Sequence, residues 1–444
     1  GYNHHYLLTT MKKIFILPCL LALLAASVLA DQSVSESDTY NVTRDQAALD
    51  VSACDPCKPI DCFEDGCDTD KFFPVFGKNH KRIFDNFEVN GWIQAGVFAN
   101  SHGTTTRRNK IPNADNRLTT VFDADSGNSY YFGNVHSTDV QINQLWLELK
   151  KEADGKHGLD WGFVGGVFFG TDAVFSQSYS DAKFDYGWQS GDYFTAIPVL
   201  YFQLAYGNLS LKVGKFETYL GYEALRAPDT IFYSHPYSFM FEPTTHSGVL
   251  AEYKPTDKLQ FVFAYTMGTG SSFENAFGDN GFLGSVSYQL TDKLNLSYTA
   301  EFERYGGGIY KNHSARDFAN NNQFMHTLVA SYDISDKWTY ALQWEVSDLK
   351  DRLNLSHSRM KAIGNYLTYK LNKFWSVGFR VEWLAFDGVD YSDYTLGLTW
   401  KPNKKVTIMP EIRFDHASDK TNKPFNYGND REQFSGGITG IYVF

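Results

Sequence analysis

The sequence predicts an all-β fold, a transmembrane antiparallel β-barrel of about 16 strands, and three observations support this prediction. From residue 88 onward, segments of roughly ten residues alternate apolar and polar side chains. Short polar turns alternate with long connections between these segments. The chain ends on an aromatic residue, Phe444, which closes the alternating run 434–444 and is typical of barrels assembled in bacterial outer membranes. A sheet with one face in hydrocarbon and one in water is stable in a membrane only when it closes on itself.

Composition favours a barrel over soluble domains, although 444 residues would suffice for two or three of them. Aromatic residues make up 16% of the chain, yet the mean hydropathy is negative. No apolar run reaches the length of a transmembrane helix. A barrel gives this combination because polar lumen-facing residues offset apolar lipid-facing ones. The formal net charge of −11 argues against a nucleic-acid partner, which requires a basic face.

The first 30 residues include the pattern of a signal peptide. From Met11, two lysines supply the positive charge, residues 14–26 form the apolar core and residues 28–30 form a small-residue cleavage site. The role of residues 1–10 is left open. We therefore expect export to the bacterial outer membrane and a mature chain that starts near Asp31. The expected parts are 1–30, an acidic Cys-rich periplasmic segment 31–86, and a barrel over 87–444.

The Cys-rich segment carries four closely spaced cysteines, Cys54, Cys57, Cys62 and Cys67. A segment too small to build a hydrophobic core in an oxidising compartment is commonly stabilised by disulfides. We predict two disulfides, whose connectivity the spacing does not determine. A four-thiolate metal site is the alternative, although the wider spacing of the second pair is unusual for zinc.

The alternation is clearest in the second half of the chain, where Trp375, Val377 and Phe379 oppose Arg380 and Glu382. Period two places each set on a single face of a sheet. The pattern predicts strands at 88–98, 140–150, 159–169, 193–206, 208–217, 245–253, 258–267, 281–290, 293–303, 323–333, 337–347, 359–371, 373–386, 392–401, 404–414 and 433–444.

The lengths of the connections indicate the topology. Short turns, such as those at 207–208, 291–292 and 402–403, alternate with long connections at about 99–139, 170–192, 218–244, 304–322 and 415–432. Outer-membrane barrels have short periplasmic turns and long external loops, so both ends of the barrel are expected on the periplasmic side. An adhesin-like β-sandwich is the soluble alternative, and it requires a second apolar face in each strand pair.

Several motifs go beyond alternation and carry a resemblance to a family. They are Gly91-Trp92-Ile93-Gln94, the run 141–147, Asp160-Trp161-Gly162, residues 170–173, Gly214-Lys215-Phe216, Gly221-Tyr222-Glu223 and His246-Ser247-Gly248. Together they resemble the second putative β-barrel porin family of bacterial outer membranes, from about residue 88 to the C-terminus. The resemblance implies a porin-like channel but no particular solute, and it does not extend to the Cys-rich segment.

The connection 218–244 is the candidate pore constriction, because the third external loop of general porins folds into the lumen. Its charges would then act on permeating solutes, with a weak preference for cations. The alternative is an ordinary external loop. The constriction candidates are Glu217, Tyr222, Glu223, Arg226, Asp229 and Glu242.

Charged residues that alternation places on the inner face are candidates for the pore wall. They are Lys212, Glu301, Glu303, Glu345, Arg380, Glu382, Glu411 and Arg413. A mixed-charge lining is the expected solvated face of a water-filled barrel.

The favoured function is passive diffusion of small hydrophilic solutes, with a structural or adhesive surface barrel as the alternative. We expect no enzymatic activity and no catalytic residues, since the scattered histidines are not spaced to a nucleophile. No cofactor and no bound metal are expected, although the Asp-rich stretch 123–128 hints weakly at calcium. The expected partners are outer-membrane lipids, solutes, the outer-membrane assembly machinery and, by analogy to general porins, two further copies in a homotrimer.

Overall fold

The computed structural model describes residues 87–102, 140–178, 184–185, 187–190, 193–273, 280–305, 321–351, 357–386, 388–418, 425 and 430–444. The predictions for the signal peptide, for residues 1–10, for the four cysteines and for the Asp-rich stretch 123–128 concern residues outside these ranges.

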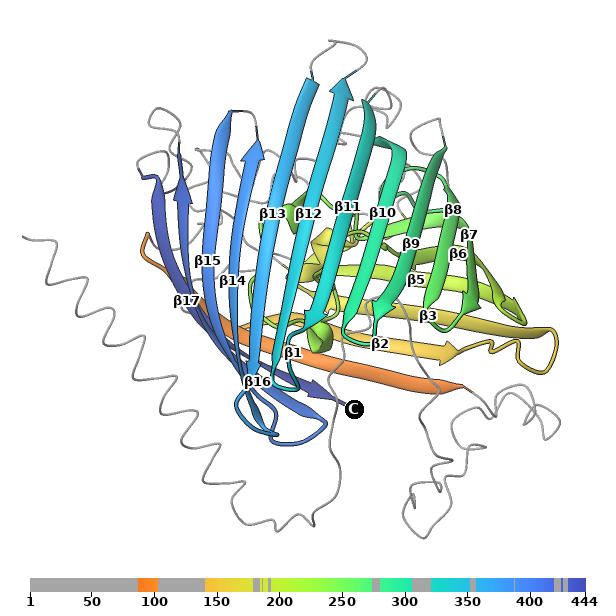
Figure 1. Ribbon diagram of the computed structural model, residues 1–444, viewed down its shortest axis with the longest axis horizontal. Coiled ribbons are helices and arrows are strands. Elements are labelled where there is room, and N and C mark those ends of the chain that lie inside the picture. The colour runs from red at the N-terminus through yellow and green to blue at the C-terminus, as the bar shows by residue number, and fades with distance from the viewer. Residues whose placement is uncertain are drawn as a thin grey trace, which may run out of the picture.

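Sixteen long antiparallel strands form a closed barrel (Figure 1), which confirms the predicted all-β fold. A two-residue strand, β4 (Gln189–Ser190), lies beside β5 and adds nothing to the wall. The barrel strands are β1 (Glu88–Asn100), β2 (Gln141–Lys151), β3 (Asp160–Gly170), β5 (Tyr193–Tyr206), β6 (Leu209–Glu217), β7 (Thr245–Thr256), β8 (Leu259–Thr266), β9 (Gly281–Thr291), β10 (Leu294–Tyr305), β11 (Asn321–Asp333), β12 (Trp338–Asp351), β13 (His357–Lys370), β14 (Trp375–Phe386), β15 (Val389–Trp400), β16 (Val406–Ala417) and β17 (Glu432–Val443).

Each barrel strand pairs with its neighbours in the chain, and β1 also pairs with β17. The closing register runs from Trp92 opposite Val443 to Asn100 opposite Ser435. Closure leaves no edge strand with unpaired backbone groups. The β-sandwich alternative is therefore wrong for the described part of the chain, which forms one sheet closed on itself.

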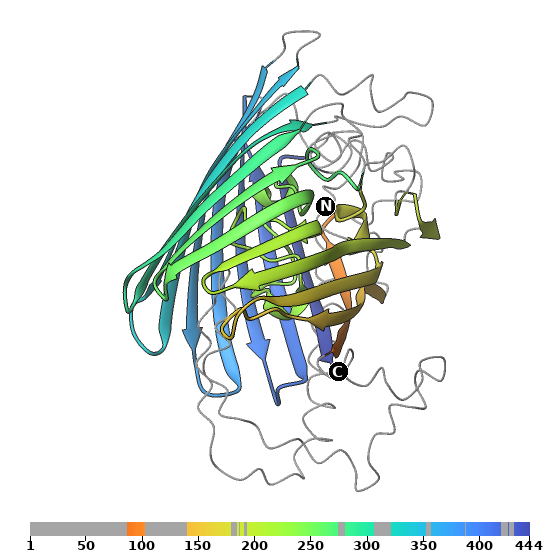
Figure 2. The ribbon, with the colours of Figure 1, turned by 90° about the vertical axis from the view of Figure 1, so that its right-hand side faces the viewer.

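The strands are steeply inclined relative to one another across the barrel (Figure 2). Alternation along them separates the two faces as predicted. On β14, Phe379 and Trp383 are 43% and 38% exposed on the outside, whereas Arg380 and Glu382 are fully buried on the inside. The outside presents aromatic and aliphatic side chains over most strands, as a lipid-facing surface requires. Among the described residues, no helix is long and apolar enough to cross a membrane.

Tight turns join the strands at one end of the barrel, for example β5 to β6, β9 to β10 and β15 to β16. The beginning of β1 and the end of β17 lie at this same end, where the Phe444 backbone N–H donates to the Gly91 carbonyl at 2.9 Å. Because the number of barrel strands is even, the start of β1 and the end of β17 lie at the end of the barrel that carries the short turns.

The strand boundaries differ from the sequence expectation where strands carry charged or polar residues. β16 continues to Ala417 instead of ending at 414, and β15 begins at Val389 instead of 392. Asp415 therefore belongs to a strand, not to a loop. A polar residue is compatible with a strand here because the inner face of the barrel is itself polar.

Candidate functional site: the inner wall and the segment 218–244

The segment 218–244 joins β6 to β7 and contains two short 3₁₀ turns, Ala227–Asp229 and Ser238–Met240. Its yellow-green turns lie among the strands instead of beyond their ends (Figure 1). It makes hydrogen bonds with inward-facing side chains of β2, β12, β14 and β16. These partners are more than 70 residues away in the chain.

Two rows of charged side chains cross the inner wall on β14, β15 and β16. The strand register sets them side by side, since residues directly opposite each other on neighbouring strands point to the same face. One row has two arginines with a threonine between them: Arg380, Thr395 and Arg413. The adjacent row is acidic: Glu382, Asp393 and Asp415.

The two arginines of the basic row bind backbone carbonyls of the segment. Arg380 donates to the Ser234 carbonyl at 2.7 Å and forms ion pairs with Glu223 at 3.0 Å and Asp393 at 3.1 Å. Arg413 donates to the His235 carbonyl and pairs with Asp415 at 2.8 Å. Both guanidinium groups are fully buried, so these charge-assisted hydrogen bonds replace hydration.

Carboxylates on the same wall accept the backbone N–H groups of the segment. Glu411 accepts from the N–H of Tyr233 at 2.8 Å and from that of Ser234, and it also accepts the Ser234 hydroxyl. Glu382 accepts from the N–H groups of Tyr237 and Ser238. Backbone groups that would otherwise be buried without partners are satisfied in this way.

Aromatic rings line the neighbouring part of the inner wall, on β1, β2 and β3, which β17 separates from β16. Trp92, Trp146 and Phe168 form a continuous stack with centroid separations of 4.6 and 4.8 Å. Arg226 of the segment lies over Trp146, with its guanidinium carbon 4.8 Å from the ring centroid. Gln144 holds the backbone next to it, donating to the Leu225 carbonyl at 2.9 Å and accepting from the Ala227 N–H at 3.2 Å.

Arg226 also forms two ion pairs, with Glu148 at 2.7 Å and Glu217 at 3.0 Å. Burial would lower the pKa of Arg226, but the two carboxylates more than reverse this effect and raise the pKa above its ordinary value. Arg226 is therefore charged at any physiological pH.

A third set of contacts lies at β12 and β13. The N–H of Tyr222 donates to Gln343 at 2.8 Å, and the ring of Tyr222 contacts that of Tyr366 at 4.6 Å between centroids. Gln343 in turn donates to Glu242 at 2.8 Å and to Glu345 at 2.7 Å. Burial raises the pKa of the Glu242 carboxyl, against hydrogen bonds that lower it.

The predicted constriction residues divide into two groups. Glu217 and Arg226 are about a third and a quarter exposed at their side chains, 30% and 24%, and Asp229 is exposed. Tyr222, Glu223 and Glu242 are buried against the wall and anchor the segment through the contacts above. Among the constriction candidates, the charged groups with exposed atoms are therefore two carboxylates, of Glu217 and Asp229, and the guanidinium of Arg226.

The predicted wall residues all lie on the inner face, and all except Glu301 form side-chain hydrogen bonds with described residues. Lys212 pairs with Glu252 at 2.9 Å, and the Tyr219 hydroxyl donates to the same carboxylate. Glu301 and Glu303 lie beside His246, while Glu345, Arg380, Glu382, Glu411 and Arg413 contact the segment or its partners.

Sequence reasoning missed several residues of this site. Asp415 was assigned to a loop, and Asp393 was not identified, although alternation within 389–400 places it inward with Tyr391 and Thr395. Lys215 was noted only as part of a motif. It is fully buried and donates to the Ser176 carbonyl at 3.0 Å and the Ser178 hydroxyl at 2.6 Å, which holds a second inward segment, 171–178.

The family model described as putative beta-barrel porin-2, OmpL-like, matches residues 86–444. The chain belongs to this porin family. The resemblance inferred from the sequence is confirmed, and so is the prediction that the chain is not an enzyme, since porins are non-enzymatic channels. No curated protein sequence matches the chain.

Solved porin structures share the fold at low identity. The outer membrane channel DcaP of Acinetobacter baumannii is 12% identical with a TM-score of 0.52, over 81% of this chain and 97% of that chain. The anion-selective porin from Comamonas acidovorans is 8% identical with a TM-score of 0.51, over 81% and 99%. A loop L8 deletion mutant of OmpT, an outer membrane protein of Vibrio cholerae, is 11% identical with a TM-score of 0.50, over 81% and 99%. This chain is accordingly a porin-like channel barrel of the outer membrane.

Proposed function

We propose that the barrel is a water-filled channel for passive diffusion of small hydrophilic solutes, and that the segment 218–244 narrows it. The observation that carries the proposal is the set of hydrogen bonds between this segment and inward-facing side chains on separate parts of the wall. Gln144 on β2, Gln343 on β12, Arg380 on β14 and Glu411 on β16 all bind it. A segment bound to four strands of the wall occupies part of the lumen through which water and solutes would otherwise pass.

The anchoring chemistry supports a fixed constriction instead of a mobile loop. Backbone N–H groups and carbonyls of 233–238 are bound by buried charged side chains of the wall, and the Tyr222 N–H is bound by the buried amide of Gln343. Releasing the segment would leave Arg380, Arg413, Glu382 and Glu411 without these partners, which is costly for buried charges unless water replaces them.

We further propose a weak preference for cations. The partly exposed charges of the segment and its root are Glu217, Arg226 and Asp229, with a net charge of −1. A charge in a confined lumen is screened less than one in bulk water, so even a small imbalance biases ion flow, and added salt reduces the bias. Glu223 and Glu242 contribute little to it because the wall buries them.

The test is single-channel recording in planar lipid bilayers. The native chain is expected to give discrete conductance steps, and deletion of 223–240 is expected to enlarge them. A deletion of similar length within 306–320, which joins β10 to β11, is the matched control for the loss of connection residues as such. Equal conductance for the native chain and the 223–240 deletion would refute the constriction. No conductance from any folded variant would favour a structural or adhesive barrel.

The same recordings test selectivity. Asp229→Asn is expected to move the reversal potential in a salt gradient toward that of a non-selective or anion-preferring pore, more strongly at low salt. Glu223→Gln is the buried counterpart and is expected to leave the reversal potential nearly unchanged in channels that fold. A larger shift for Glu223→Gln than for Asp229→Asn would contradict the assignment of the exposed charges.

Homotrimer formation stays a prediction, which chemical cross-linking in detergent would check.

A further inference from the structure

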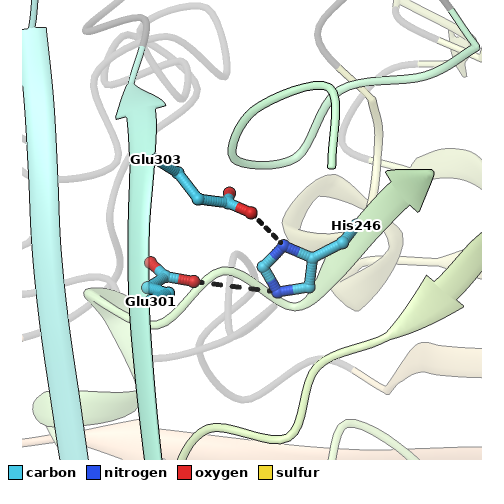
Figure 3. A group of neighbouring side chains, drawn as sticks. All are labelled: His246, Glu301 and Glu303. Carbon is cyan, nitrogen blue, oxygen red and sulfur yellow. Dashed lines mark hydrogen bonds and ion pairs between the residues drawn. The ribbon is translucent and has the colours of Figure 1, made fainter. Parts of the chain in front are cut away.

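Three buried side chains meet at the root of the segment 218–244: His246, Glu301 and Glu303 (Figure 3). His246 is the second residue of β7, and the two glutamates lie two residues apart on β10, so both point into the barrel. One ligand atom from each residue lies within 4.8 Å of those from the other two. The three side chains are fully buried.

Glu301 is the unusual member of this group. Neither of its carboxylate oxygens has a hydrogen-bond partner in the described part of the chain. One of these oxygens faces His246, at 3.8 Å from Nε2 (Figure 3). Buried carboxylates are normally paired, hydrogen-bonded or bound to a metal, because an isolated buried charge is very costly.

The other two members are oriented by surrounding hydroxyl groups. His246 Nδ1 lies 3.2 Å from Glu303 Oε1, and Nε2 lies 3.1 Å from the Thr218 hydroxyl. Thr266 and Thr269 both donate to Glu303, the latter at 2.9 Å. Metal-binding histidines and carboxylates are commonly oriented by hydrogen bonds from surrounding groups, and these hydroxyl groups supply such bonds here.

We propose that His246, Glu301 and Glu303 bind one divalent transition-metal ion of the Zn²⁺ type. In this site one ring nitrogen of His246 is a ligand, and each glutamate supplies one oxygen. Bonds of about 2.0–2.2 Å require small side-chain rotations that draw the three atoms together. An imidazole nitrogen with two carboxylates suits Zn²⁺ better than Ca²⁺ or Mg²⁺, which prefer oxygen ligands alone.

Charge balance supports a divalent ion. Two ionised glutamates and a neutral imidazole carry two negative charges, which one divalent cation neutralises. The ion pairs that the described residues make with Glu301 and Glu303 involve only His246, and no lysine or arginine. Without a cation, the cluster avoids an unbalanced buried charge only by taking up protons.

The position of the site links it to the segment. The Thr218 N–H donates to the Thr244 carbonyl at 3.1 Å, so the two ends of the segment meet beside His246. A bound ion would connect this root to β10. Metal binding is therefore expected to stabilise the inward position of the segment, in addition to the contacts at β14 and β16.

The experiment measures metal bound to the full-length chain in detergent, without a histidine tag. The protein is treated with a chelator, exposed to Zn²⁺, passed through a desalting column and analysed for zinc by mass spectrometry. We expect about one Zn²⁺ per chain. We also expect that the folded gel band converts to the unfolded band at a higher temperature when zinc is bound.

Variants locate the bound ion. Glu301→Gln and His246→Gln are expected to lose the bound zinc while keeping the mobility of a folded barrel. Glu432→Gln and His326→Gln are matched controls on residues outside the cluster and should keep it. A chain with the four cysteines of segment 31–86 changed to serine should also keep one Zn²⁺ per chain. Zinc that disappears with the cysteines, or that is unaffected in Glu301→Gln and His246→Gln, would overturn the proposal. Absence of bound zinc in the native chain would equally overturn it, in favour of a histidine paired with two carboxylates.

Discussion

At the scale of single residues, the stability of the inner wall depends on buried charges that have several partners. Arg413 binds Asp415, the His235 carbonyl and the ring of Tyr237, whose centroid lies 5.0 Å from the guanidinium carbon. Removing one member of a buried ion pair leaves the other uncompensated, at a cost of roughly 3–5 kcal/mol. The wall charges identified from alternation are thus structural as well as lumen-facing.

We expect Arg413→Met to lower the free energy of unfolding by about 3–5 kcal/mol, because Asp415 and the His235 carbonyl lose a buried partner. Urea titration of the detergent-folded barrel, followed by tryptophan fluorescence, measures this change. Arg359→Met is the control: Arg359 pairs with Asp348 at 3.2 Å but is about half exposed, so a loss below about 1 kcal/mol is expected. Adding Asp415→Asn to Arg413→Met should recover part of the loss. Equal losses at positions 413 and 359 would contradict the structural role of Arg413.

At the scale of elements, sequence reasoning found all sixteen barrel strands because period-two alternation is a local property. The strand expected at 404–414 differs from β16 only by its boundaries, since Asp415 and His416 resemble loop residues when the polar inner face is unknown. The contacts of the segment could not be found in this way. Glu223 and Arg380 are 157 residues apart in the chain, and their pairing depends on how the segment crosses the folded barrel. The sequence therefore identified Glu223 as a constriction candidate but could not show that it is buried.

Gly170 allows β3 to approach β2 closely where the inward segment 171–178 begins. Gly170 ends β3 with φ of +155°, and a Cβ atom there would lie 1.9 Å from the Asn143 carbonyl oxygen on β2. We expect Gly170→Ala to destabilise the barrel by more than about 1 kcal/mol, because the backbone of β2 would have to move. Gly440→Ala on β17 is the control, since a Cβ atom there meets nothing within 4 Å and the change should stay within about 0.5 kcal/mol. The same urea titration compares them, and similar stability of both variants would contradict the close approach.

At the scale of the whole molecule, barrel closure connects the last residue of the chain to its first strand. The pairing of β1 with β17 continues to the Phe444 N–H, which donates to the Gly91 carbonyl. The Phe444 ring lies over Gly91, where a Cβ atom would come within 2.5 Å of two ring atoms. Sequence alone indicated Phe444 as an assembly signal, whereas its contact with Gly91 requires the closed barrel. The glycine of the Gly91-Trp92-Ile93-Gln94 motif thus has a physical reason, because the terminal aromatic occupies the space beside it.

We expect Phe444→Ala to lower the fraction of chains that become folded barrels in the outer membrane, since the closing strand loses the aromatic ring that packs on Gly91. The measurement is the ratio of heat-modifiable to unfolded bands in isolated outer membranes. Tyr442→Ala is the matched control: Tyr442 is 44% exposed, close to the 48% of Phe444, but the ring nearest to Gly91 is that of Phe444. It should reduce the folded fraction less, because interfacial aromatics contribute to membrane anchoring at many positions around the barrel. Equal effects at positions 442 and 444 would mean that lost lipid contact, instead of the closure at Gly91, limits assembly.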